Sequence, residues 1–111
     1  MITVDIDSKD IPNLRSVYHK ALGYGKTRVT ETTHGFHMRI KSNIKDPLEI
    51  IRIRRILGDD QKRIEHDLIL IELGHPELAN RLFQWKRQLG SKEFVKEKAF
   101  DVHRLNGGEN E

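Results

Sequence analysis

The first residues of the chain alternate strictly between apolar and polar side chains, and a helix start follows them directly. The apolar positions are Ile2, Val4 and Ile6, and the polar positions are Thr3, Asp5 and Asp7. This period of two is typical of a half-buried strand. Residues 8–12 combine polar capping residues with Pro12, which predicts a helix start, and the glycines at 23 and 25 predict its end. The chain therefore begins with a strand and an amphipathic helix.

A hairpin is expected next. Residues 26–33 are rich in threonine and valine, which favours a second strand. A turn at His34–Gly35 leads into a third strand over 36–41. There Phe36, Met38 and Ile40 face one way, and His37, Arg39 and Lys41 face the other. The short connection predicts that the two strands pair antiparallel.

Later elements are predicted from their capping residues. Aspartates that precede apolar periodicity predict helices over 46–57 and 59–73, each closed by a glycine. Residues 68–71, Leu-Ile-Leu-Ile, also fit a buried strand, but the cap before them and Gly74 after them favour the helix. Pro76 predicts a further helix up to Gly90, and the alternation over 99–105 predicts a last strand. Residues 106–111 are expected to form a flexible tail.

This order of elements predicts a single α+β domain over residues 1–105. The expected fold is an RNA-recognition-motif-like or ferredoxin-like sandwich, with extra helices before the last strand. In it, one face of an antiparallel sheet of about four strands packs on helices and the other face stays open. A chain of 111 residues suffices for one core of this kind.

Composition excludes several classes of function. The chain has no cysteine, which excludes disulfides, thiolate zinc sites and a cysteine nucleophile. Neither a signal peptide nor an apolar run of about 20 residues is apparent, so a cytoplasmic location without membrane contact is expected. The net charge of +3 is compatible with nucleic-acid binding, but backbone binding needs clustered cations rather than a mild excess.

The open face is expected to collect the polar residues of three strands. These are Asp5 and Asp7, His37 and Arg39, and Asp101 and His103. Carboxylates on neighbouring strands could share Mg²⁺ or Mn²⁺, and three of them could complete a two-metal site for phosphoryl transfer. The arginine beside the histidine could hold a phosphate.

Each of these features also has a purely structural interpretation. Aspartates at strand ends often cap the next helix, and a histidine on a wet sheet face is often only a surface residue. Asp59–Asp60 is expected to cap a helix rather than to bind a metal. The basic residues are expected to form a solvated helix face; they are Arg52, Arg54, Arg55, Lys62 and Arg63.

Three segments of the chain resemble the motifs of the archaeo-eukaryotic primase superfamily. Asp5-x-Asp7 at the end of an apolar strand resembles the first motif, and residues 30–37, Thr-Glu-Thr-Thr-His-Gly-Phe-His, resemble the second. Phe100–Asp101 is the best match to the third, with Asp67 as a poorer substitute. The resemblance implies Asp5, Asp7 and Asp101 as catalytic, metal-binding carboxylates. It also implies template-directed synthesis from nucleoside triphosphates, with His37, Arg39 and Lys41 on the substrate side.

Two other functions are open on the same residues. A non-catalytic module could bind DNA or RNA backbone through Arg39, Lys41 and arginines of the helices. A small homodimer could pair through a sheet face or edge. The open face is expected to carry no aromatic side chain, which argues against a stacking platform for single strands.

Overall fold

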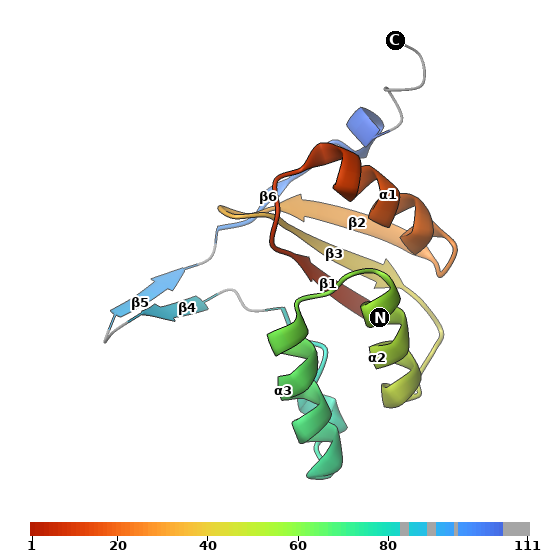
Figure 1. The fold of residues 1–111 in the computed structure, drawn as a ribbon, viewed down its shortest axis with the longest axis vertical. Coiled ribbons are helices and arrows are strands. Elements are labelled where there is room, and N and C mark those ends of the chain that lie inside the picture. The colour runs from red at the N-terminus through yellow and green to blue at the C-terminus, as the bar shows by residue number, and fades with distance from the viewer. Residues whose placement is uncertain (83–84, 89–90, 95, 106–111) are drawn as a thin grey trace.

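The computed structural model describes residues 1–82, 85–88, 91–94 and 96–105, without the side chains of 85–94. The order of elements along the chain follows in Figure 1. They are β1 (Ile2–Ile6), α1 (Ile11–Leu22), β2 (Lys26–Glu31), β3 (Phe36–Lys41), α2 (Pro47–Ile56), α3 (Gln61–Glu72), the 3-10 helix η1 (Pro76–Leu78), β4 (Trp85–Gln88), β5 (Ser91–Phe94), β6 (Lys98–Ala99) and the 3-10 helix η2 (Val102–Leu105).

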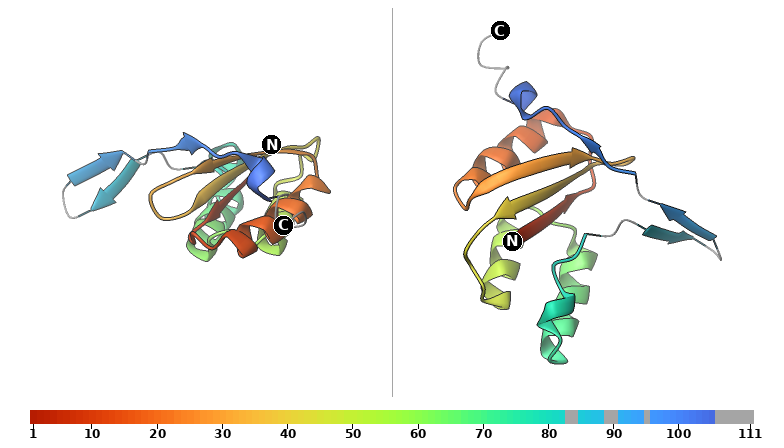
Figure 2. Two further views of the ribbon diagram at one scale, coloured as in Figure 1. Left: turned by 90° about the horizontal axis from the view of Figure 1, so that it is seen from above. Right: turned by 180° about the vertical axis from the view of Figure 1, so that it is seen from behind.

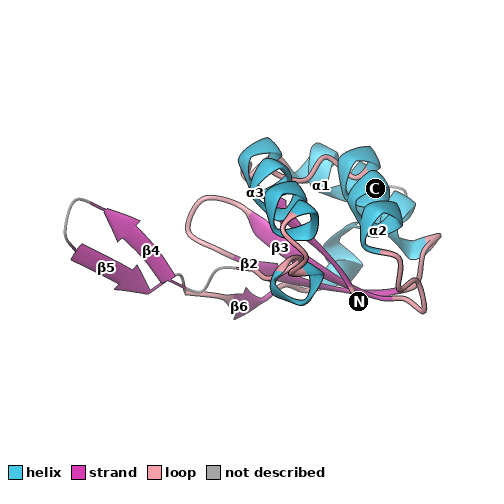
Figure 3. Ribbon diagram, turned by 90° about the horizontal axis from the view of Figure 1, so that it is seen from below, coloured by secondary structure: helices cyan, strands magenta, loops and turns pink. Residues whose placement is uncertain are grey.

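The expected α+β architecture is confirmed. Strands β1, β3, β2 and β6 form an antiparallel sheet in that order. The helices α1, α2 and α3 lie on one side of this sheet, so the other side is open (Figure 3). Strands β4 and β5 form a separate two-stranded sheet that projects away from the four-stranded one (Figures 1 and 2).

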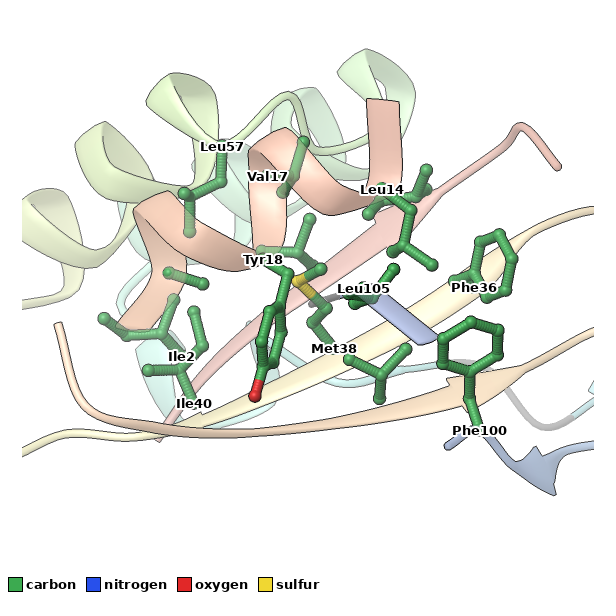
Figure 4. Close-up of a cluster of buried hydrophobic side chains, with 14 of the residues drawn as sticks. Ile2, Leu14, Val17, Tyr18, Phe36, Met38, Ile40, Leu57, Phe100 and Leu105 are labelled. Atoms are coloured by element: carbon green, nitrogen blue, oxygen red, sulfur yellow. The ribbon is translucent and has the colours of Figure 1, made fainter. Parts of the chain in front are cut away.

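The core lies between the sheet and the helices, as the alternation predicts. Ile2, Val4 and Ile6 of β1 are all buried, and so are Phe36, Met38 and Ile40 of β3. They pack against an apolar stripe of α1 that includes Leu14 and Val17, and Figure 4 shows this cluster. Phe100 closes one end with its ring 5.2 Å from that of Phe36. The parity of each strand therefore fixes which side chains face the open side.

The predicted helix over 76–90 is wrong in the described residues. A 3-10 turn, η1, forms at Pro76–Leu78 in place of the helix, and residues 85–88 are a strand. The chain leaves the helical path at Asn80, whose φ of 65° is left-handed. Long-range hydrogen bonds hold Asn80 there; among them, its N–H donates to Asp67 Oδ2, and its Oδ1 accepts from the N–H of Thr3. Tertiary hydrogen bonds thus override the helical periodicity.

The predicted last strand over 99–105 is also wrong in extent. Regular pairing ends with β6 at Ala99, and η2 begins at Val102. The carboxylate of Asp101 accepts the N–H of His103 at 3.0 Å, the type of contact that starts a helical turn. Phe100 is nevertheless buried, as predicted. The helix over 59–73 is confirmed, because α3 spans Gln61–Glu72, and residues 106–111 lie outside the described residues.

Candidate nucleic-acid interface

Two pairs of cations lie directly opposite each other on the open face. Lys26 pairs with Lys41, and Arg28 pairs with Arg39, across β2 and β3. We call these four residues the basic stripe. Lys26, Arg28 and Lys41 are exposed, and in the described part of the chain they form no ion pair. Like charges directly opposite each other destabilise a sheet, so this arrangement is not explained by the fold.

At one end of the basic stripe, three side chains converge on a single carboxylate, that of Glu97. Its Oε1 accepts from Thr30 Oγ1 at 2.6 Å and from Arg39 Nη1 at 2.9 Å, and it lies 2.9 Å from His37 Nδ1. Its Oε2 accepts from Arg39 Nη2 at 3.1 Å. We call Thr30, His37 and Arg39 the anion site, because both oxygens of one anion are bound there in a forked geometry.

The anion site strongly favours negative charge. Burial raises the pKa of Glu97, but hydrogen bonds from Arg39, Thr30 and His37 outweigh it and lower that pKa to about 2. His37 itself is only 4% exposed. The interpretation of His37 as a wet surface residue is wrong, because the side chain is covered and its Nδ1 lies 2.9 Å from Glu97 Oε1. Its role as a phosphate ligand stays a prediction.

Asp5 lies beside the anion site, as the strand parity predicts. It is the register partner of His37, and its Oδ1 lies 3.6 Å from His37 Nε2. Burial raises the pKa of Asp5, while His37 and Arg63 lower it and Asp59 and Asp60 add to the rise. Two carboxylates, Asp5 and Glu97, therefore flank one imidazole.

The other two predicted metal ligands lie outside the paired strands of the sheet. Asp7 is exposed and lies beyond the last residue of β1. Asp101 follows β6, which is three strand positions from β1 in the sheet, or about 14 Å at the usual strand spacing. A metal pair is only about 4 Å apart. Among the described residues no three His, Asp or Glu side chains are placed to hold a metal ion. The Mg²⁺ or Mn²⁺ site therefore stays a prediction from the sequence.

Sequence reasoning missed a buried ionic network at the outer edge of β1. The helix cap predicted for Asp59–Asp60 is confirmed at Asp60, which accepts the N–H groups of Lys62 and Arg63. Asp59 Oδ2 instead accepts from Arg54 Nε and from Arg63 Nη1, each at 2.7 Å. The prediction that Arg54 and Arg63 belong to a solvated helix face is wrong, because they are 0% and 5% exposed.

This network completes the hydrogen bonding of the β1 edge. The N–H of Asp5 donates to Asp59 Oδ1 at 2.8 Å, and the N–H of Thr3 donates to Asn80 Oδ1 at 3.0 Å. The carbonyl of Thr3 accepts from Arg63 Nη1 at 3.2 Å. Side chains therefore replace the neighbouring strand that β1 lacks on this side.

Glu97 was missed because nothing in its local sequence, Lys-Glu-Lys, distinguishes it from a surface residue. The clustering of cations could have been found, since pairing the predicted strands 26–33 and 36–41 across the short turn already places basic residues side by side. No helix within the described part of the chain is long and apolar enough to cross a membrane. No protein family, curated protein or solved structure matches the chain.

Proposed function

We propose that the open face of the sheet binds the phosphate backbone of a nucleic acid, through charge and not through base stacking. The basic stripe carries this proposal: four cations face each other in pairs on a surface that the core does not need. Arg39 belongs to the stripe and to the anion site, so the site would hold one phosphate and the stripe the next ones. Clustered cations of this kind supply most of the affinity in sequence-independent binding.

Recognition of this type depends on charge rather than on base stacking. None of the described open-face positions of β1, β2 and β3 carries an aromatic ring, since Phe36 faces the core. Four backbone contacts give a slope of about −3 for the logarithm of the binding constant against the logarithm of salt concentration. Base composition should have little effect on affinity.

Fluorescence anisotropy with labelled oligothymidine at several salt concentrations tests the proposal. Arg28→Gln/Lys41→Gln removes two cations of the basic stripe and should make the slope shallower by about 1.4. The matched control is Arg55→Gln/Lys62→Gln, which removes the same charge from exposed positions on α2 and after the Asp60 cap of α3. It should leave the slope within experimental error.

An equal decrease of the salt-dependent slope in the two double variants would show that binding depends on the overall charge of the protein and not on the basic stripe. A loss confined to the control would move the interface to the helices. Absence of salt-dependent binding both by the unsubstituted protein and by a variant whose anion site is freed of its own carboxylate would overturn the proposal.

A primase-type nucleotidyltransferase is the second candidate function. The pairing of Asp5 with His37 favours it, because the resemblance assigns these residues to metal and to nucleotide phosphate. The two residues are register partners, and Asp5 Oδ1 lies 3.6 Å from His37 Nε2. The position of Asp101 counts against it.

Manganese binding separates the two candidates. Calorimetric titration of Mn²⁺ into the protein and into Asp5→Ala/Asp7→Ala, followed by primer synthesis from nucleoside triphosphates, tests the enzyme directly. Metal binding that the double substitution abolishes would support the nucleotidyltransferase. Oligonucleotide binding without metal binding in the millimolar range would leave only the binding module.

A further inference from the structure

We propose that Glu97 is a tethered substitute for a backbone phosphate, and that nucleic acid binds to the anion site only after this carboxylate has left it. The inference rests on the proposed function and adds its regulation: an internal contact holds the site closed. The contacts that carry it are those of Thr30, His37 and Arg39 with both oxygens of the Glu97 side chain.

A carboxylate and a phosphodiester present the same features to these donors. Each carries one negative charge and two terminal oxygens, and a guanidinium binds either through two parallel hydrogen bonds. Exchange of one for the other therefore keeps the charge of the anion site and its hydrogen bonds. The two anions cannot occupy the site together, because Oε1 of Glu97 already lies within 3.0 Å of donors from all three side chains.

The segment that carries Glu97 is joined to the sheet by a short strand, by an ion pair between Lys98 and Glu31, and by one hydrogen bond from the Phe100 N–H to the Val29 carbonyl. Its strand, β6, contributes only Lys98 and Ala99, both exposed, which pair with Glu31 and Thr30. The next fixed point is Phe100, which is buried in the core. On the other side the chain continues to β5, which pairs with β4 and belongs to a separate sheet. Release of Glu97 thus requires the loss of one short strand and leaves the core intact.

A tethered competitor lowers the affinity for an external ligand. A group fixed a few residues from its site acts at an effective concentration in the millimolar range or above. Removing the charge of Glu97 leaves the donors in place and weakens the competitor. Glu97→Gln should therefore bind oligothymidine about tenfold more tightly, which corresponds to 1.4 kcal/mol.

The matched control is Glu72→Gln, an exposed position at the end of α3 that removes the same charge far from the open face. It should change the dissociation constant by less than a factor of about two, the size of a screened, long-range charge effect. Equal gains in the two variants, or weaker binding by Glu97→Gln, would overturn the inference.

A measurement on the unsubstituted protein makes the test independent of folding defects in a variant. The carboxyl carbon of Glu97 can be followed by NMR during acid titration, where its pKa of about 2 marks the occupied anion site. Saturating oligothymidine should raise that pKa toward the ordinary value of 4.5, since the carboxyl then lies in water. An unchanged pKa in the bound state would contradict release.

These outcomes separate the inference from the proposed function. Salt-dependent binding that the basic-stripe variant weakens, together with no effect of Glu97→Gln, would refute the internal competitor alone. Binding by Glu97→Gln in the absence of binding by the unsubstituted protein would support both. No binding by either protein would overturn both.

Discussion

Replacement of Asp59 by alanine should cost far more stability than the same replacement at its neighbour Asp60. The Asp59 carboxylate accepts four hydrogen bonds: from the backbone N–H groups of Asp5 and Asp60, and from the side chains of Arg54 and Arg63. Its removal leaves two guanidinium groups without their shared anion in a region where both arginines are at most 5% exposed.

The magnitude follows from the charges left behind. Breaking a buried ion pair by removing one partner costs about 3–5 kcal/mol, because the remaining charge stays desolvated. Asp60→Ala loses only a helix cap, with its acceptor for the N–H of Lys62, and a cap contributes about 1 kcal/mol. The free energy of unfolding of a whole domain is only about 5–15 kcal/mol. Asp59→Ala should therefore lower Tm by at least about 12 °C, at roughly 4 °C per kcal/mol.

Urea unfolding followed by circular dichroism measures both free energies under one condition. The two variants remove the same charge one residue apart, so differences in net charge cancel. Equal losses of stability, or a loss below about 1 kcal/mol for Asp59→Ala, would show that the ionic network does not hold the β1 edge.

Two further predictions concern stability. Because the pKa of Glu97 is depressed, its ionised form stabilises the fold above about pH 4.5, and this contribution disappears as pH falls toward 2. In urea titrations at acid pH, the difference in unfolding free energy between the unsubstituted protein and Glu97→Gln should therefore disappear over that range. A difference that does not depend on pH would refute the assignment. Gly35→Ala should cost about 1–3 kcal/mol, since its Cβ would lie 1.8 Å from the carbonyl oxygen of Ile6. At Gly74 a Cβ meets nothing within 4 Å and only the positive φ opposes alanine, so the loss there should be nearer 1 kcal/mol by the same unfolding assay; a reversed order would contradict the close approach.

The first half of the fold could be predicted from sequence because its signals are local. Alternation in β1 and β3 assigns each side chain to a face, and this placed Asp5, His37 and Arg39 together correctly. The failures come from contacts between distant residues. Asn80 breaks a periodic helix through bonds to Thr3 and Asp67, 77 and 13 residues away.

The candidate site was also predictable only where its signals are local. Its cations follow from strand parity, but the carboxylate that binds them, Glu97, is 58 residues from Arg39. Its identity depends on how the chain returns along β2 after the β4–β5 hairpin, and local patterns carry no information on that path. The predicted strand over 99–105 failed for the same reason: the alternation of Phe100 with its neighbours is real, yet regular pairing stops at Ala99.

The edges of the sheet bear on the homodimer hypothesis. At β1 the N–H groups of Thr3 and Asp5 already donate to Asn80 and Asp59, so a strand from a second copy could pair there only by displacing a buried network. At the other edge, β6 pairs only with Thr30 and Glu31 of β2, so residues 26–28 have no neighbouring strand on that side in the described part of the chain. Two copies paired antiparallel there would bring these cations together, and charged residues on an edge oppose such pairing. Neither edge favours self-association. Within the basic stripe, Glu97 neutralises Arg39, whereas Lys26, Arg28 and Lys41 form no ion pair among the described residues. These three cations are the groups that the proposed phosphate ligand would neutralise.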